Sequence, residues 1–365
     1  MTHILSPESI EKLDFKASVK KEHLRRLYPK LSDDLFEKKW QHASDHVWLF
    51  FRSFPRLWHA SLSVIADQLE TSFCVGDPHP DNFGFIQFEN RVRYVVNDFD
   101  DAGFGPSVFD ILRYLVALDL IGDTELVSSA ATTFETGLGQ QQTALNLSKD
   151  LFKDLGRKRR KLIKKFTDGK NRFRLNDSDL FELPSNEKTI WQETFQGLFS
   201  TFAHSGDYRV HDVVQRRKTS GGSAGQRRYY VLVEEKRSQK LDVIEFKLLA
   251  NAAGARYRGA NALEPKQRLE KAMKTFWLDD EPIHKYEYRE ISGQPFLMRS
   301  RTKASLKWHK LSLKEKTEVC KVQVGQLAEI HWRQGVRNIG EKQEFIEATK
   351  RLAEIWRQWH LSLFQ

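Results

Sequence analysis

The sequence predicts an α+β fold in which a small antiparallel β lobe joins a large, mainly helical lobe. In the first 70 residues and again after residue 312, apolar residues recur at helical spacing. Between residues 208 and 302, runs rich in β-branched and aromatic residues alternate with turn sequences, as in antiparallel sheets. A separate strand–turn–strand pattern occupies residues 83–96.

These patterns divide the chain into four expected segments. Residues 1–70 form an N-terminal helical segment of the large lobe, and residues 71–200 form the segment of that lobe that carries the candidate site. Residues 208–302 form the small β lobe, and residues 303–365 return to the large lobe as helices. The turn-rich stretch 167–190 is the best boundary within the chain.

Capping residues and turn residues predict where individual elements begin and end. Ser107 is expected to begin a helix with Asp110 as its capping-box partner, and Ser312 is expected to begin another with Glu315. That second helix should stop at Gly335. The small lobe should contain a helix at residues 264–276 and five strands, at residues 209–217, 228–234, 241–248, 286–291 and 295–299.

The hairpin predicted at residues 83–96 brings three oxygen-bearing side chains together. Asp77 and Asn82 precede its first strand and Asp98 follows its second, so all three lie at the open end of the hairpin. Oxygen ligands of this kind are typical of a site for a hard divalent cation. The sequence therefore predicts a metal site, with Asp100 as a further candidate ligand.

A glycine-rich sequence at residues 219–226 lies between two expected strands of the small lobe. Glycines in such a loop let backbone amides approach phosphate oxygens without a side-chain clash. A flexible hairpin loop would have the same composition, so the loop alone is weak support for phosphate binding. The candidate phosphate-binding residues are Gly221, Gly222, Ser223 and Gly225.

Lys247 lies on the strand that follows this hairpin, from which it would project towards the same phosphates. Its sequence neighbours are apolar, which predicts a buried lysine rather than an exposed one. A buried ammonium group needs a carboxylate partner, and Glu264 and Glu270 on the following helix are the candidates.

The charge balance is basic, and a solvated basic surface is its more common explanation. The net charge is +10, which fits either a solvated basic surface or a field that attracts nucleotides, phosphorylated substrates or nucleic acid. The basic run at residues 156–165 has no interleaved aromatic residues and no reader motif, so it is interpreted as a solvated helix face. Nucleic acid is therefore not an expected partner.

Cysteine usage and hydropathy indicate a cytoplasmic protein. Two cysteines are too few for a disulfide framework or a cysteine-based zinc site, and they favour a reducing compartment. The N-terminal sequence lacks the charged start and apolar run of a signal peptide. No apolar run approaches the ~20 residues of a membrane helix, so no membrane partner is expected.

The motif Gly-Asp-Pro-His-Pro-Asp-Asn at residues 76–82 resembles the catalytic loop of the protein-kinase-like superfamily, in the form found in aminoglycoside phosphotransferases and choline kinases. The segment Val-Asn-Asp-Phe-Asp-Asp-Ala-Gly, residues 96–103, is similar to the metal-binding segment of small-molecule kinases. This resemblance implies that Asp77 orients or deprotonates the acceptor hydroxyl and that Asn82 and Asp98 bind metal. It also implies that Asp110 braces the loop.

The chain as a whole is similar to a bacterial family of unknown function that shares this loop, the Asn-Asp-Phe-Asp segment and a late glycine-rich hairpin. In ordinary kinases the glycine loop and the lysine precede the catalytic loop, whereas here they follow it. Residues 327–335 also resemble the helix that leads into that loop. The resemblance thus implies a circularly permuted kinase-like two-lobe fold, in which Lys247 should lie close to Asp98.

The function implied by the resemblance is an ATP- and Mg²⁺-dependent phosphotransferase that acts on a hydroxyl group of a small molecule. Residues 219–226 would cover the ATP phosphates, and Lys247 would contact the α- and β-phosphates. The acceptor and the oligomeric state are not indicated by the sequence. Acidic residues near the loop would either attract a cationic acceptor or tune metal binding: Asp81, Asp100 and Asp101.

Three alternatives remain open at this point. The protein is a non-catalytic nucleotide-binding relative of kinases, or it transfers AMP rather than phosphate. The third alternative is a metallophosphoesterase, because Asp77-Pro-His79 has the form of a metal-binding Asp-x-His motif. That last alternative needs further His and Asn ligands in a regular order, which His204 and His211 do not provide.

Overall fold

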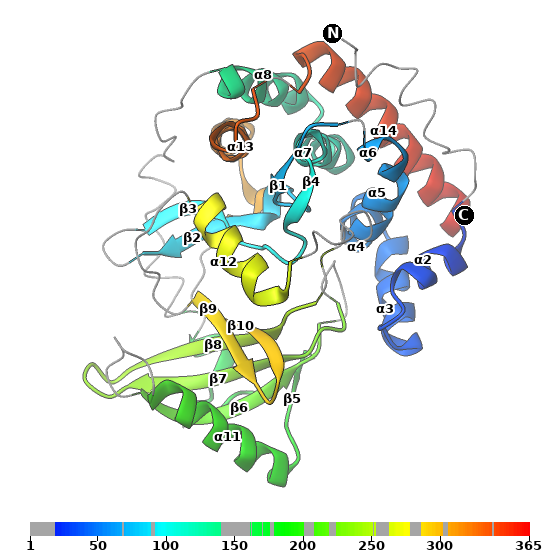
Figure 1. The fold of residues 1–365 in the computed structure, drawn as a ribbon. Coiled ribbons are helices and arrows are strands. Elements are labelled where there is room, and N and C mark those ends of the chain that lie inside the picture. The colour runs from blue at the N-terminus through cyan, green and yellow to red at the C-terminus, as the bar shows by residue number, and fades with distance from the viewer. Residues whose placement is uncertain are drawn as a thin grey trace.

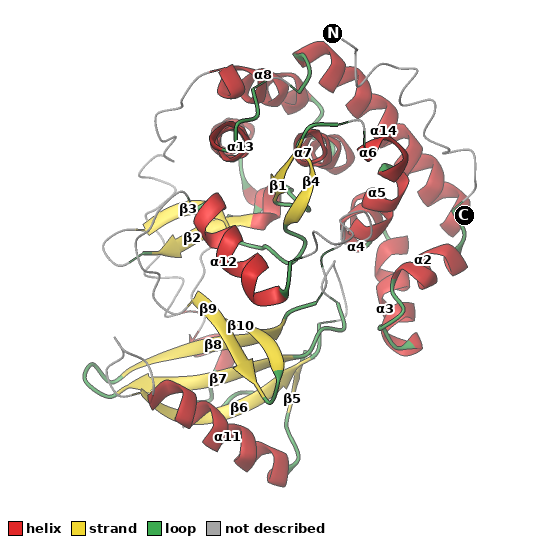
Figure 2. Ribbon diagram, in the orientation of Figure 1, coloured by secondary structure: helices red, strands yellow, loops and turns green. Residues whose placement is uncertain are grey.

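The computed structural model confirms an α+β fold, with most helices in one part and the largest sheet in the other (Figures 1 and 2). We call these the helical part and the sheet part. Residues 219–223 of the glycine-rich loop and most of the basic run lie outside the described residues. The described residues are 19–67, 69–88, 92–139, 161, 163–169, 171–175, 179–200, 208–218, 224–250, 252, 263–277, 286–301, 306–337 and 339–365.

Helices from both ends of the chain form the helical part (Figure 1). Trp356, near the C-terminus, packs on Phe50 and Phe51, with ring centroids 5.1 and 4.7 Å apart. The N-terminal helices are α2 (Lys21–Leu27), α3 (Asp33–Ser44), α4 (Val47–Ser53), α5 (Pro55–Ser61) and α6 (Ser63–Ala66). The others are α7 (Val108–Ile121), α8 (Glu125–Gly139), α13 (Leu313–Arg333) and α14 (Lys342–Phe364), and a short 3₁₀ turn, Trp308–Lys310, precedes α13.

The sheet part is built on a six-stranded antiparallel sheet in the order β5-β6-β7-β8-β10-β9. One face is covered by α11 (Ser185–Ser200), whose Phe195 and Phe199 are buried with Ile244 and Phe246 of the sheet (Figure 1). The strands are β5 (Leu180–Phe181), β6 (Tyr208–Arg216), β7 (Arg228–Glu235), β8 (Lys240–Leu248), β9 (Tyr286–Ile291) and β10 (Gln294–Ser300).

The packing differs from the expected segment boundaries in two places. Residues 71–200 were expected to lie in the large lobe, but β5 pairs with β6 and the apolar face of α11 lies on the sheet. The helix α12 (Pro265–Phe276), expected in the small lobe, contributes instead to the core of the helical part. Its Phe276 stacks on Phe73, with ring centroids 5.4 Å apart. Apolar faces, rather than chain order, decide where both helices lie.

Two small sheets in the helical part position the site. The strands β1 (Thr71–Cys74) and β4 (Gly103–Pro106) form one antiparallel pair. The predicted hairpin forms the other, from β2 (Phe83–Gln87) and β3 (Val92–Val96), with a 3₁₀ turn at Pro80–Asn82 before β2. Because Phe83 pairs with Val96, the ends that carry Asn82 and Asp98 lie together, as the sequence predicts.

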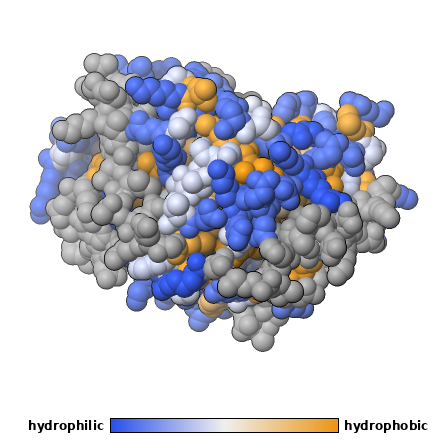
Figure 3. All heavy atoms as spheres, turned by 90° about the horizontal axis from the view of Figure 1, so that it is seen from above, coloured by the Kyte–Doolittle hydropathy of each residue, from blue (hydrophilic) through white to orange (hydrophobic). Residues whose placement is uncertain are grey.

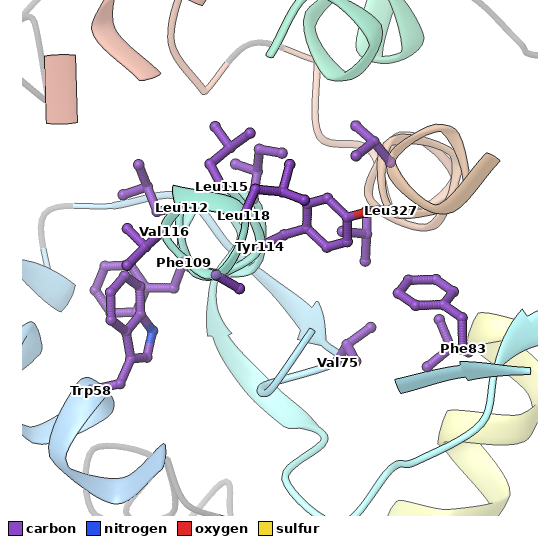
Figure 4. Close-up of a cluster of buried hydrophobic side chains, with 14 of the residues drawn as sticks. Trp58, Val75, Phe83, Phe109, Leu112, Tyr114, Leu115, Val116, Leu118 and Leu327 are labelled. Carbon is purple, nitrogen blue, oxygen red and sulfur yellow. The ribbon is translucent and has the colours of Figure 1, made fainter. Parts of the chain in front are cut away.

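The helix α7 is the centre of the helical core. Leu112, Leu115 and Leu118 extend from it among other apolar side chains, and Leu327 of α13 lies nearby (Figure 4). Every residue from Val108 to Leu120 is buried, so this helix is enclosed on all sides rather than amphipathic. Charged groups on such a helix need partners, and this helix carries two that belong to the candidate site.

The two predicted capping boxes have different outcomes. At α13 the box is confirmed: the Ser312 hydroxyl accepts the N–H of Glu315 at 3.3 Å, and the Glu315 carboxylate accepts the N–H of Ser312 at 2.8 Å. At α7 the box is wrong, because Ser107 is the N-cap but makes no side-chain capping hydrogen bond. The carboxylate of Asp110 accepts hydrogen bonds from the loop before β2 instead.

Among the described residues on the face seen from above in Figure 3, most are hydrophilic, and the hydrophobic ones lie in small areas between them. This view looks onto the helical part of the molecule. Among the described residues, no helix has the length and apolar composition needed to span a bilayer.

We expect Leu115→Ala to lower the free energy of unfolding by about 2–5 kcal/mol, because a fully buried leucine would be replaced by a cavity. Leu361→Ala, at an exposed position of α14, should change it by no more than about 0.5 kcal/mol. Urea denaturation of both variants measures the difference. Equal losses would contradict the central role of α7.

Candidate active site

The loop between β1 and β2 is held by a carboxylate from α7. The N–H groups of Val75 and Gly76 donate to the two oxygens of Asp110 at 2.7 and 2.9 Å. Asp110 is buried, so these two hydrogen bonds satisfy donors and acceptor that water cannot reach. The expectation that Asp110 braces this loop is therefore met.

His331 of α13 lies beside this brace. His331 Nε2 lies 3.2 Å from Asp110, and its Nδ1 lies 2.8 Å from the hydroxyl of Ser72. Cys74, Asp110 and His331 also lie close enough together to resemble a buried metal-binding group. Because both oxygens of Asp110 already accept backbone N–H groups, we interpret these three residues as structural support for the loop.

Asp77 is paired with a buried arginine. Its Oδ1 lies 2.5 Å from Nε of Arg113, and the guanidinium group of Arg113 lies over the ring of Phe51, with its carbon 4.2 Å from the ring centroid. Burial raises the pKa of Asp77 to about 6, although Arg113 favours the charged form. A carboxylate with this pKa is mainly ionised at neutral pH and is able to accept a proton.

Asn82 joins the loop to the hairpin. Its side-chain nitrogen donates to the carbonyl oxygen of Asp77 at 2.8 Å, and its own carbonyl accepts the N–H of Asn97 at 3.0 Å. Asp98 is the next residue after Asn97. The structure thus brings Asp77, Asn82 and Asp98 to the same end of the hairpin, as expected from their positions in the sequence.

Lys247 reaches this point from the sheet part. Its ammonium group lies 3.4 Å from Oδ1 of Asp98 and is also paired with Asp100. The prediction that Lys247 is buried is confirmed, since its side chain is fully enclosed. The prediction of its partner is wrong: Glu270 pairs with Lys266 on the surface of α12, and Glu264 lines a pocket. The packing of the sheet against the helical part places Lys247 beside the end of the hairpin rather than beside α12.

The structure explains why one position of the predicted glycine loop, residue 225, is occupied by glycine. Gly225 has a φ of +77°, and a Cβ at this position would overlap a methyl group of Leu31. Its N–H donates to the carbonyl oxygen of Lys218 at 2.9 Å, which closes the base of the loop. Gly221, Gly222 and Ser223 lie outside the described residues.

A pocket of about 1150 Å³ opens between the two parts beside Asp100. Its volume is slightly above the ~300–1,000 Å³ of typical small-molecule sites, so the pocket is large enough to hold a nucleotide-sized ligand. Its walls come from the N-terminal helices, from the segments that precede β7 and follow β8, and from the starts of α12 and β10. Lining residues include Tyr28, Arg56, Asp100, Asp101, Gly225, Leu248 and Glu264.

A buried charge network secures the sheet to the hairpin. Glu245 lies 3.1 Å from Arg228 and 2.5 Å from Arg299, and Arg299 donates to the carbonyl oxygen of Asn97 at 3.4 Å. Burial alone would raise the pKa of Glu245, but attraction by Arg299, Arg301 and Arg228 outweighs it and holds the pKa well below its ordinary value. Glu245 therefore remains ionised.

Two of these residues were missed in the sequence, although each left a signal. Arg113 is a charged residue in an otherwise apolar helix, three residues after Asp110. Glu245 precedes Lys247 by two residues on a strand, so both lie on the same face.

His79 is buried, its Nδ1 accepts the N–H of Asp81 at 3.3 Å, and its ring packs on Trp48. Its place within the loop favours a structural role over the Asp-x-His metal motif.

Gly76→Ala should lower the free energy of unfolding by at least about 2 kcal/mol. Gly76 has a φ of +86°, and a Cβ there would overlap the carbonyl oxygen of Asp101. Gly105→Ala is the matched control, because no described atom lies within 4 Å of the Cβ position. Thermal or urea unfolding should show little change for the control, and equal tolerance at Gly76 would contradict the close contact of the two loops.

Glu245→Gln should lower the free energy of unfolding at pH 7 by about 3–5 kcal/mol, since two arginines lose their buried partner. The depressed pKa of Glu245 contributes stability above its ordinary pKa of 4.5, and this contribution is lost as pH falls through the folded-state value. The difference in free energy of unfolding between the wild type and Glu245→Gln should therefore become smaller below about pH 4.5. Exposed Glu22→Gln serves as the control, and a pH-independent difference would contradict this assignment.

A family model described as an uncharacterized protein conserved in bacteria (DUF2252) matches residues 32–135 and 134–360. No curated protein and no solved structure matches the chain. The matched ranges contain the loop of Asp77, the hairpin, the sheet part, α13 and most of α14. The chain therefore belongs to the DUF2252 family.

Proposed function

We propose that this protein is an ATP- and Mg²⁺-dependent phosphotransferase of protein-kinase-like fold that acts on a hydroxyl group of a small molecule. The observation that carries this proposal is the contact of Lys247 with Asp98 and Asp100, beside the loop of Asp77 and Asn82. In kinases, a strand lysine, a metal-binding Asp and a catalytic-loop Asn form such a group around ATP.

The oxygen donors at the hairpin end fit a magnesium ion. Asp98 and Asp100 supply carboxylates, and the side chain of Asp98 remains 30% exposed and thus accessible. Asn82 uses its amide nitrogen in the bond to Asp77 and keeps its amide oxygen as a ligand. When bound, Mg²⁺ would neutralise negative charge on the transferred phosphoryl group.

Lys247 suits contact with nucleotide phosphates. Burial lowers the pKa of Lys247 to about 8, while Asp98 opposes this shift, so the ammonium group stays largely charged at neutral pH. A desolvated cation interacts strongly with phosphate oxygens because little water screens the charge. The pocket beside Asp100 provides room for a bound small molecule.

Asp77 would act on the acceptor. The acceptor oxygen forms a bond to the γ-phosphorus, the bond from that phosphorus to the bridging oxygen of ADP breaks, and the hydroxyl proton passes to Asp77. Arg113 holds Oδ1 of Asp77, so Oδ2 is the oxygen that would receive the proton. Most of the catalysis would come from positioning and charge stabilisation.

Circular permutation of a kinase-like chain accounts for the order of these residues. Lys247 and His331 follow the loop of Asp77 in sequence, yet Lys247 contacts Asp98 and His331 supports Asp110. In ordinary kinases the corresponding strand lysine and helix come first. We infer that 208–302 correspond to the nucleotide lobe and that α13 corresponds to the helix leading into the catalytic loop.

Mg²⁺-ATP should raise the melting temperature of the wild-type protein, since a ligand at about 100 times its Kd adds about 2.7 kcal/mol to stability. Asp98→Asn should remove this shift, and Asp77→Asn should keep it while abolishing phosphate transfer. Asp67→Asn, an exposed carboxylate on the surface, is the control. Labelled γ-phosphate or labelled AMP on an acceptor then distinguishes phosphoryl transfer from AMP transfer.

Each other outcome has a distinct meaning. A magnesium-dependent shift without transfer to any acceptor would favour a non-catalytic nucleotide-binding protein. No shift in the wild type, or transfer by both Asp77→Asn and Asp98→Asn, would contradict the proposed site.

A further inference from the structure

Two carboxylates share one ammonium group at the end of the hairpin. Nζ of Lys247 lies 3.4 Å from Oδ1 of Asp98 and is also paired with Asp100. These three side chains therefore carry one surplus negative charge, and the adjoining Asp101 is a further acidic residue on the wall of the pocket. The ammonium group thus bridges the same two carboxylates that the proposed function assigns to a metal ion.

Lys247 approaches these carboxylates from the protein interior. It lies in β8, inside the sheet, where it is paired with Arg228 of β7 and with Leu297 of β10. Its side chain is fully enclosed, whereas the side chains of Asp98 and Asp100 are 30% and 15% exposed. A metal ion would therefore reach the two carboxylates from their exposed side and would meet the positive charge of Lys247 behind them.

Lys247 depends on these two carboxylates for its charge balance. Among the described residues, Asp98 and Asp100 are the only carboxylates in ion-pair contact with it. Glu245, on the same face of β8, is engaged by Arg228 at 3.1 Å and by Arg299 at 2.5 Å. If a metal ion took both aspartates, a buried ammonium group would remain without a counterion, which is strongly unfavourable.

We propose that Lys247 is an internal counterion that occupies the metal position of Asp98 and Asp100 until a nucleotide binds. This inference rests on the proposed phosphotransferase function and adds an autoinhibitory contact to it. Phosphate oxygens of the nucleotide would accept the ammonium group, and the carboxylates would then be available to Mg²⁺. Metal and nucleotide would thus bind together. Of the two roles considered for Asp100, tuning of metal binding is thereby favoured over attraction of a cationic acceptor.

The proposal assigns two opposite effects to one substitution. In Lys247→Met, both carboxylates keep their charge and lose the ammonium group that competes with a metal ion, so metal alone should bind more tightly. The same substitution removes a contact to phosphate, so the complex of metal and nucleotide should bind more weakly. General damage to the fold would weaken both.

Electron paramagnetic resonance of free Mn²⁺, which suits the same oxygen ligands as Mg²⁺, measures metal binding to the full-length protein without nucleotide. We expect Lys247→Met to bind Mn²⁺ at least about tenfold more tightly than the wild type. Lys247→Arg keeps the charge and should show no gain. Lys266→Met, which removes a lysine from the exposed pair with Glu270, should match the wild type. Adding Asp98→Asn to Lys247→Met should abolish the gain.

Isothermal titration calorimetry with Mn²⁺ and AMPPNP, a non-hydrolysable ATP analogue, measures the second effect. The wild type should bind this complex, and Lys247→Met should bind it at least about tenfold more weakly. Melting curves in EDTA identify the variants that fold. If Lys247→Met does not fold, Lys247→Gln takes its place, because the glutamine amide still donates hydrogen bonds to the carboxylates.

The remaining outcomes separate this inference from the proposed function. Equal Mn²⁺ affinity in Lys247→Met and wild type, or an equal gain in Lys247→Arg, would overturn the role of Lys247 as a counterion, even if the wild type binds AMPPNP. If the wild type does not bind AMPPNP but Lys247→Met gains Mn²⁺ binding that Asp98→Asn abolishes, Lys247 does occupy the metal position and the proposed function fails.

Discussion

The candidate site depends on one buried carboxylate, that of Asp110. Two consecutive backbone N–H groups, at Val75 and Gly76, point into the protein where no water can satisfy them, and Asp110 accepts both. His331 supports this carboxylate from α13, and Asp101 lies directly against Gly76. The loop of Asp77 is therefore fixed by residues from three distant stretches of sequence, and the geometry of the whole site follows from that arrangement.

Much of the fold and the centre of the site were predictable from local signals. The β2–β3 hairpin, five of the six strands of the sheet and the capping box of Ser312 depend on neighbouring residues, and the structure contains all of them; the short strand β5 was not predicted. The convergence of Asp77, Asn82 and Asp98 follows from hairpin geometry alone.

What the sequence did not predict depends on packing between distant segments. The sequence predicts a partner for Lys247 on α12, the next helix in the chain, but the apolar face of α12 packs on Phe73 in the helical part. The position of α11 on the sheet and the pairing of Asp77 with Arg113 are similar cases. A single sequence shows that a charge is buried, but does not show which distant charge will meet it.

The separation of the site residues along the chain has a consequence for biosynthesis. The loop of Asp77 and the hairpin leave the ribosome well before Lys247, and His331 follows later still. Until Lys247 and His331 have been synthesised, Asp98 and Asp100 lack the contact with Lys247, and Asp110 lacks the contact with His331. Because contacts between distant segments form late in folding, a nascent or truncated chain would hold these carboxylates in an unfinished, mutually repelling arrangement. The site is thus completed only once the chain has been made through α13.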